Sequence, residues 1–337
     1  MKINLIEITD LEKLTAKREG ETKIGETIHA GSSIILDTIE KSTANFVIFG
    51  IPEDIGPRAN CGRGGSDGGW TAFLEKFVNL QENKFMRGAS ILLLGSIDCS
   101  KWNSIDSKDI AQLRKAVESL DEVVSDLVRI IIAANKIPII IGGGHNNAYG
   151  ALKGSFQALN QSINCINLDP HADYRAAEGR HSGNSFSYAK SENYLDSYAV
   201  LGLDENYNSE VMLQQLIDDG VHYVFFEDVF VRERLNFTDA TKQLLNRIND
   251  KYYGVELDCD AIENFPSSAQ TPSGISPNDA RKYINMVGAS PNAIYLHLPE
   301  AAPSLVADSA AQVGKLLAYL VSDFIKARVQ FINQLYV

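Results

Sequence analysis

The sequence predicts an α/β fold, a three-layer α/β/α sandwich built around a mainly parallel sheet. Short β-rich apolar runs alternate with helical patterns from about residue 45 onward. The runs are continuously apolar, which is typical of parallel strands covered on both faces. Because no internal repeat or Pro/Ser-rich linker divides the 337 residues, we expect one domain over 1–337. Within it, the segment 1–40 has the least definite pattern.

Seven apolar runs are the expected strands, at 45–51, 90–95, 137–141, 164–168, 221–226, 252–257 and 293–298. One helix is expected where apolar residues recur at steps of three and four and form a single stripe: Ile110, Leu113, Val117, Leu120, Val124, Leu127 and Ile131. Another begins near Ser276, which can cap it, with Pro277 in the first turn. A C-terminal helix carries Val313, Leu317, Leu320 and Phe324 on one side.

The amino-acid composition excludes some classes of binding partner and indicates a cellular compartment. There are 43 acidic and 31 basic side chains, giving a net charge of −12. This balance argues against nucleic acid or an anionic membrane as a partner. No apolar run approaches the roughly 20 residues of a membrane span, and the start of the chain lacks a signal-peptide core. Four scattered cysteines fit neither a zinc site nor a disulfide framework, so we expect a cytoplasmic protein.

Polar side chains follow four of the expected strands at the point where each ends. In open parallel sheets, ligands bind beyond the carboxyl ends of the strands. These four strand ends bring together four aspartates, two histidines and a glutamate, namely His145, Asp169, His171, Asp173, Asp258, Asp260 and Glu300. We therefore expect a chemically active edge of the sheet.

The spacing of these residues favours a metal site. Extended chain has a two-residue period, so Asp258 and Asp260 can point the same way, as can Asp169, His171 and Asp173. Carboxylates packed together out of water repel one another unless cations neutralise them. Oxygen and imidazole ligands suit manganese, and less selectively iron, zinc or magnesium. Taken singly, an Asp-x-Asp is more often a turn feature and a lone histidine is usually structural.

Three segments, GGGHNNAYG, NLDPHADYR and ELDCDAI, resemble the metal-binding segments of the arginase, or ureohydrolase, superfamily. Within it, GIPEDIGPRANCGRGG, the SGNSF stretch beginning at Ser182, and TPSGISP near Thr271 look most like formimidoylglutamases. The resemblance covers roughly residues 45–305. It implies an α/β/α domain that binds two manganese ions per chain. Because the family often forms symmetric oligomers, a homo-oligomer is also implied, although no residue here indicates an interface.

The resemblance also implies a role for each residue. It assigns His145 and Asp173 to one ion, His171 and Asp260 to the other, and Asp169 and Asp258 to both as bridges. Glu300 would face the cationic nitrogen group of the substrate, or else be a structural carboxylate before Pro303. Four aspartates and a bridging hydroxide leave two divalent ions with one net negative charge, which favours a small cationic amidine or guanidine substrate. Asp173 would relay a proton to the leaving amine.

Further substrate contacts are expected in two loops. Arg175 suits a carboxylate of N-formimidoylglutamate, with a salt bridge to Glu178 as the alternative. Asn60 is a candidate for the substrate pocket or for ordering its Gly-rich loop. Ser182 and Asn184 belong to the SGNSF stretch and are expected to bind substrate.

One histidine and two substitutions leave alternatives open. Arginases and agmatinases have a histidine directly before the glycine that corresponds to Gly183. This chain has Ser182 at that position, and His181 is one position earlier. His181 is therefore either a catalytic proton shuttle or an ordinary loop histidine. Asn146 stands where the family commonly has an acid or serine, and Glu256 where it has a small hydroxyl residue.

The leading hypothesis is a metal-dependent hydrolase of a linear amidine C–N bond, converting N-formimidoyl-L-glutamate and water into L-glutamate and formamide. The alternative in the same superfamily is a guanidino hydrolase of the arginase or agmatinase type, which releases urea. A third hypothesis of another class is a non-catalytic protein that keeps the fold for binding or assembly.

Overall fold

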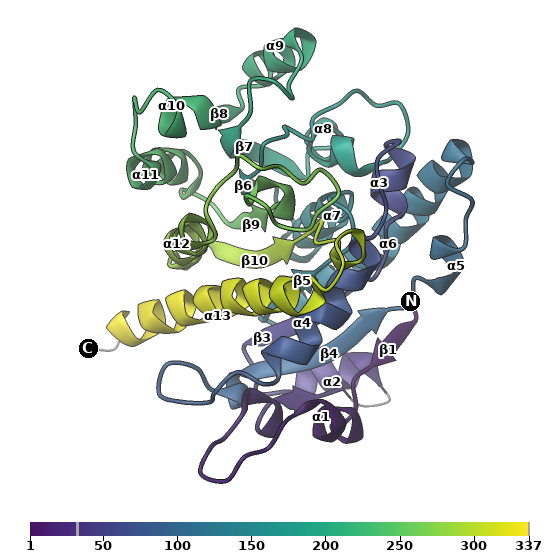
Figure 1. Cartoon of the computed structure of the whole chain (residues 1–337), viewed down its shortest axis with the longest axis vertical. Coiled ribbons are helices and arrows are strands. Elements are labelled where there is room, and N and C mark those ends of the chain that lie inside the picture. Colours follow the sequence, from purple (N-terminus) through teal and green to yellow (C-terminus); the bar gives the residue numbers. More distant parts are fainter. Residues whose placement is uncertain (32–33, 336–337) are drawn as a thin grey trace.

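The computed structural model describes residues 1–31 and 34–335 and has an α/β fold with a large, mostly parallel sheet (Figure 1). Within those residues the strands are β1 (Ile3–Leu5), β2 (His29–Ala30), β3 (Phe46–Gly50), β4 (Ile91–Ile97), β5 (Ile137–Ile141), β6 (Ile163–Leu168), β7 (Leu195–Leu203), β8 (His222–Phe225), β9 (Tyr253–Leu257) and β10 (Ala293–Leu298). Their order in the sheet is β1-β4-β3-β5-β10-β9-β6-β7-β8, and β2 also pairs with β4. The expected fold class is confirmed.

Helices form the two outer layers. They are α1 (Ile8–Leu14), α2 (Ile35–Lys41), α3 (Ile55–Ala59), α4 (Gly69–Phe77), α5 (Ser100–Asn103), α6 (Ile110–Ala133), α7 (Asn147–Leu159), α8 (Ser185–Ser191), α9 (Glu210–Asp218), α10 (Phe226–Phe230), α11 (Phe237–Ile248), α12 (Pro277–Gly288) and α13 (Ala310–Leu335). One hydrophobic cluster joins the sheet to α4, α11, α12 and α13, and a second joins it to α3, α6, α7 and α8. Figure 1 shows α13, in yellow, in front of the sheet.

The strands are buried on both faces, as their continuous apolar runs predict. In β3, Val47 packs into one cluster and its neighbour Ile48 packs into the other. Since successive side chains of a strand point to opposite faces, both faces must be covered by apolar residues. All strand pairs are parallel except β1 with β4.

The expected strands match β3, β4, β5, β6, β8, β9 and β10, with ends that differ by at most two residues. The structure adds β1, β2 and β7. The segment 1–40, which has no definite sequence pattern, contributes β1 and β2 to one edge of the sheet beside β4. The expected cap of α12 is also present, because the Ser276 Oγ accepts from the Asp279 amide. None of the described helices combines the length and apolarity needed to cross a bilayer.

The four strands that carry the polar residues are neighbours in the middle of the sheet. In space they run β5-β10-β9-β6, although β6 directly follows β5 along the chain. The parallel pairings of β10 with β5 and β9, and of β9 with β6, bring their carboxyl ends to one edge. The topology therefore gathers residues 145, 169–173, 258–260 and 300.

Candidate metal centre and substrate cavity

His145 lies at the centre of the first group of polar side chains. It follows Gly142 and Gly143, whose positive φ values of 82° and 71° favour glycine and let the chain turn sharply after β5. The His145 Nδ1 atom is 3.2 Å from an oxygen of Asp169, 3.0 Å from one of Asp173 and 2.9 Å from one of Asp258. One ligand atom from each of these four residues lies within 4.8 Å of the others.

His171 and Asp260 form the adjacent part of the centre. The His171 Nδ1 atom is 3.5 Å from the Oδ1 of Asp169, whereas the Oδ2 of Asp169 faces His145. The Asp169 carboxylate therefore contacts both histidines, one through each oxygen. Asp260 accepts hydrogen bonds from the Ala269 amide at 3.0 Å and the Ser268 hydroxyl at 3.3 Å.

The buried carboxylates of this centre repel one another unless cations neutralise them. Asp169, Asp258, Asp260 and Glu300 are all buried, with exposed fractions of 4% or less. Burial, reinforced by the charges of Asp260 and Asp169, raises the pKa of Asp258 well above its ordinary value. Burial and the charges of Asp260 and Asp258 likewise raise the pKa of Glu300 well above its ordinary value. Divalent cations remove this repulsion, and carboxylate oxygens with imidazole nitrogens are ligands that suit manganese. The side chains present thus fit a metal centre.

A cavity of about 220 Å³ opens next to this centre. Its wall includes eight of the residues expected from the sequence: Asn60, His171, Asp173, Arg175, Ser182, Asp258, Asp260 and Glu300. His145 and Asp169 are not on the wall and lie deeper, with exposed fractions of 1% and 0%. The buried part of the wall, which we call the floor of the cavity, is acidic, because Asp258, Asp260 and Glu300 lie there.

His181 and Asn184 are not part of the cavity wall. The buried His181 ring accepts from the Gly183 amide through Nδ1, and its Nε2 is 3.1 Å from a Glu178 oxygen. Burial lowers the pKa of His181 to about 4, so its imidazole is neutral at pH 7. Asn184 accepts from Arg180 and donates to Gly179. Both side chains make hydrogen bonds within their own loop, which for His181 is the geometry of an ordinary loop histidine.

Arg175 lies on the cavity wall and also forms the salt bridge to Glu178 that its sequence position allows. Its guanidinium lies on the cavity wall and is half exposed. It donates to the Asn60 side chain at 3.2 Å and is 3.3 Å from a Glu178 oxygen. The cavity therefore has a cationic group at its mouth and acidic groups at its floor.

Two further residues at the cavity could not be predicted from the sequence pattern. The Tyr207 ring stacks on His171 with centroids 5.3 Å apart and planes 23° apart. Asn208 accepts from the Ala172 amide and donates to the Pro170 carbonyl, which holds the loop after β6 in place. Both follow β7, the strand that the sequence pattern did not reveal, so their proximity to the centre could not be anticipated.

Comparisons with known proteins identify relatives of the chain. The model of the arginase family matches residues 44–324. The formimidoylglutamase of Macrococcus caseolyticus is 28% identical over 283 residues, which are 81% of this chain and 83% of that protein. The formimidoylglutamase of Geobacillus thermodenitrificans is 27% identical over 297 residues, 87% of each chain.

Solved structures share the fold. The formimidoylglutamase of Bacillus subtilis matches with a TM-score of 0.76 at 16% sequence identity and covers 94% of both chains. The formiminoglutamase of Trypanosoma cruzi, solved with two Mn²⁺ ions, matches with a TM-score of 0.71 at 20% identity. That match covers 91% of this chain and 98% of the other.

Proposed function

The chain belongs to the arginase family and is a metal-dependent amidohydrolase, and we propose that it converts N-formimidoyl-L-glutamate and water into L-glutamate and formamide. The observation that carries this proposal is the polarity of the cavity. Its acidic floor, with Asp258, Asp260 and Glu300, suits the amidinium end of that substrate, and the Arg175 guanidinium at its mouth suits a carboxylate. Relatives named formimidoylglutamase, at 26–28% identity, support the same substrate.

We further propose that the centre holds two manganese ions, as in the Trypanosoma cruzi protein. The proposed ligands are His145 and Asp173 for one ion, His171 and Asp260 for the other, and Asp169 and Asp258 as bridges. When bound, two divalent ions lower the pKa of water and offset negative charge that develops on the reacting group. The contact of each Asp169 oxygen with a different histidine supports its bridging role.

The chain's own side chains then orient the substrate and move protons. Glu300 has one oxygen bound to the His145 amide, while its other oxygen, buried, lacks a hydrogen-bond partner among the described residues. That free oxygen can accept from the amidinium. Water adds to the amidine carbon and gives up a proton to Asp173, on the cavity wall, which passes it to the glutamate nitrogen. The C–N bond breaks, which leaves formamide and glutamate.

The test is product release by the manganese-loaded protein, with agmatine and L-arginine assayed in parallel for urea. We expect glutamate from N-formimidoyl-L-glutamate, and none after chelation of the metal. Urea from agmatine or arginine without glutamate would contradict the proposed substrate and indicate the guanidino branch instead. No product from any of the three would contradict it as well and direct the search to other amidines.

A matched pair of arginine variants tests recognition of the substrate carboxylate. Arg175→Met should raise KM for N-formimidoyl-L-glutamate about tenfold or more, because a hydrogen bond to a charged group contributes about 1.5–3 kcal/mol. Arg114 also contacts Glu178 but is not on the cavity wall, so Arg114→Met should leave KM unchanged. Equal effects of the two variants would argue for a structural role of Arg175.

A further inference from the structure

Glu256 is a buried carboxylate in the middle of the sheet, directly behind the proposed metal centre. It lies in the otherwise apolar strand β9 and is fully buried. Acidic side chains are almost never fully buried unless they are paired. Two partners come from the neighbouring strand β10: the Tyr295 hydroxyl donates to Oε1 at 2.9 Å, and His297 Nδ1 is 2.7 Å from Oε2. Residues 295 and 297 share one face because strands have a two-residue period.

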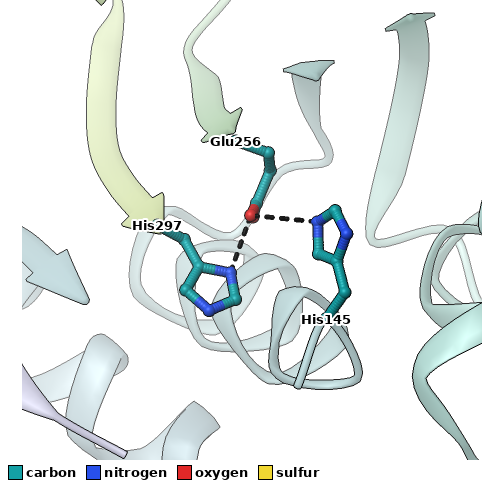
Figure 2. A group of neighbouring side chains, drawn as sticks. All are labelled: His145, Glu256 and His297. Carbon is teal, nitrogen blue, oxygen red and sulfur yellow. Dashed lines mark hydrogen bonds and ion pairs between the residues drawn. The ribbon is translucent and has the colours of Figure 1, made fainter. Parts of the chain in front are cut away.

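The third partner is His145. The Glu256 Oε2 atom lies 3.4 Å from His145 Nε2, so this one oxygen stands between two imidazole rings (Figure 2). No hydrogen bond satisfies His145 Nε2 anywhere in residues 1–31 and 34–335. A movement of about 0.2–0.3 Å would bring the contact into the usual range for an N–H···O bond. Glu256 is therefore the acceptor that this nitrogen faces.

The two nitrogens of His145 have different surroundings. Nδ1 faces Asp169, Asp173 and Asp258, whereas Nε2 faces Glu256. Spacing alone would allow a metal in either group, since His145, Glu256 and His297 also have ligand atoms within 4.8 Å of one another. A neutral imidazole, however, has one lone pair and one N–H, so it cannot bind a metal through both nitrogens.

The neighbours decide which nitrogen has the lone pair. The three carboxylates at Nδ1 need cations to neutralise their mutual repulsion. Glu256, in contrast, is already stabilised by hydrogen bonds from Tyr295 and His297. We propose that Glu256 is a positioning residue, which accepts the Nε2–H of His145 and so directs the Nδ1 lone pair at the metal centre. An acceptor on the N–H of a metal-binding histidine fixes the tautomer and orientation of the ring. Its loss typically weakens metal affinity 10- to 100-fold. This inference rests on the proposed role of His145 as a ligand.

The test is a double-mutant cycle on manganese affinity, measured by calorimetric titration of the metal-free protein. Glu256→Ser removes the acceptor, and we expect it to weaken one of the two binding steps about 10- to 100-fold and to leave the other unchanged. Because Glu256 acts through the imidazole, the same substitution should cause no further loss in a His145→Asn background. An equal loss in both backgrounds, or a wild-type affinity in Glu256→Ser, would overturn the proposal.

A matched control is Tyr283→Phe. The Tyr283 hydroxyl donates to the backbone carbonyl of Glu256 and is equally buried, but among the described residues the hydrogen bonds to the Glu256 carboxylate come from Tyr295 and His297 instead. Tyr283→Phe should therefore bind both ions with wild-type affinity. A loss equal to that of Glu256→Ser would mean that any disturbance of this part of the sheet affects the metal, which would overturn a specific role.

Two further outcomes keep the inference separate from its premise. If His145→Asn itself binds both ions with wild-type affinity, the ligand assignment fails, and the inference fails with it. If Glu256→Ser does not fold, as judged by thermal unfolding without metal, Glu256→Gln takes its place in the cycle. Glutamine keeps the volume and one acceptor oxygen, so it should cause a smaller loss that again disappears in the His145→Asn background.

Discussion

Two residues at the metal centre have strained backbones. Asp173 and Glu300 adopt positive φ values of 46° and 65°, in the left-handed region that side chains other than glycine rarely occupy. Such conformations cost about 1–3 kcal/mol and cluster at functional sites. Each residue directs its carboxylate to the cavity wall. The strain therefore agrees with the proposed proton transfer by Asp173 and the proposed amidinium contact of Glu300.

A buried neutral histidine makes folding stability depend on pH. The pKa of His181 is about 4 in the folded chain and about 6.5 when unfolded. Its contribution is therefore fully present above pH 6.5 and is lost as the pH falls toward 4. The difference in unfolding free energy between wild type and His181→Gln should change by up to about 3 kcal/mol over this window. Urea unfolding with chelator present measures it. A difference that is independent of pH would contradict the buried neutral state.

At the scale of elements, the buried Arg180 connects the loop between β6 and α8 to α6 and to the start of α7 by hydrogen bonds. Arg180 is 3% exposed, and it donates to the Asp121 carboxylate on α6 and to the Asn146 carbonyl before α7. It also donates to Asn184 within the loop. The loop that carries Arg175 and Ser182 to the cavity thus has one rigid anchor.

Removal of that anchor should be costly. Arg180→Met leaves Asp121 buried without its partner, so we expect a loss of about 3–5 kcal/mol in unfolding free energy at pH 8. The loss should be smaller near pH 5, because burial already raises the pKa of Asp121 to about 6. Arg129→Met is the matched control, since Arg129 pairs with Asp126 on the exposed side of the same helix and should cost less than about 1 kcal/mol. Equal losses in urea unfolding would refute the anchoring role.

The strands with long apolar runs were predictable, and so were the polar residues at their ends, because burial on both faces leaves a clear sequence pattern. β7 was not, since its second and third residues are the half-buried, polar Asp196 and Ser197 and it contains Gly202 at a φ of 87°. Tyr207 and Asn208 were missed with it. The contacts of Glu256 come from β10 and from the loop after β5, which spacing along one segment does not contain.

At the scale of the whole molecule, metal binding and folding are coupled. The proposed ligands come from three strand ends, those of β5, β6 and β9, that only the folded sheet brings together. A cation that binds the folded state alone stabilises it by about 2.7 kcal/mol per site at 100 times its Kd. Manganese should therefore raise the thermal midpoint of the wild-type protein. Asp258→Ala should lose bound metal, hydrolytic activity and most of this rise together.

Asp196→Ala is the control for this prediction, because Asp196 is half-buried and pairs with Lys251 away from the cavity. It should keep both ions and the full thermal shift. Metal content by elemental analysis and calorimetry distinguish the two variants. Two bound ions and full activity in Asp258→Ala would eliminate Asp258 as a bridging ligand.

The position of β10 also has a consequence for synthesis of the chain. β10 lies between β5 and β9 in the sheet, yet it is made after both of them. Until residue 298 has left the ribosome, the nascent sheet consists of two separate parts, each with an open, apolar strand edge. Such edges are prone to pair with other chains. The last strand therefore closes a gap at which the unfinished protein is most vulnerable to aggregation, and only then can a metal ion be enclosed.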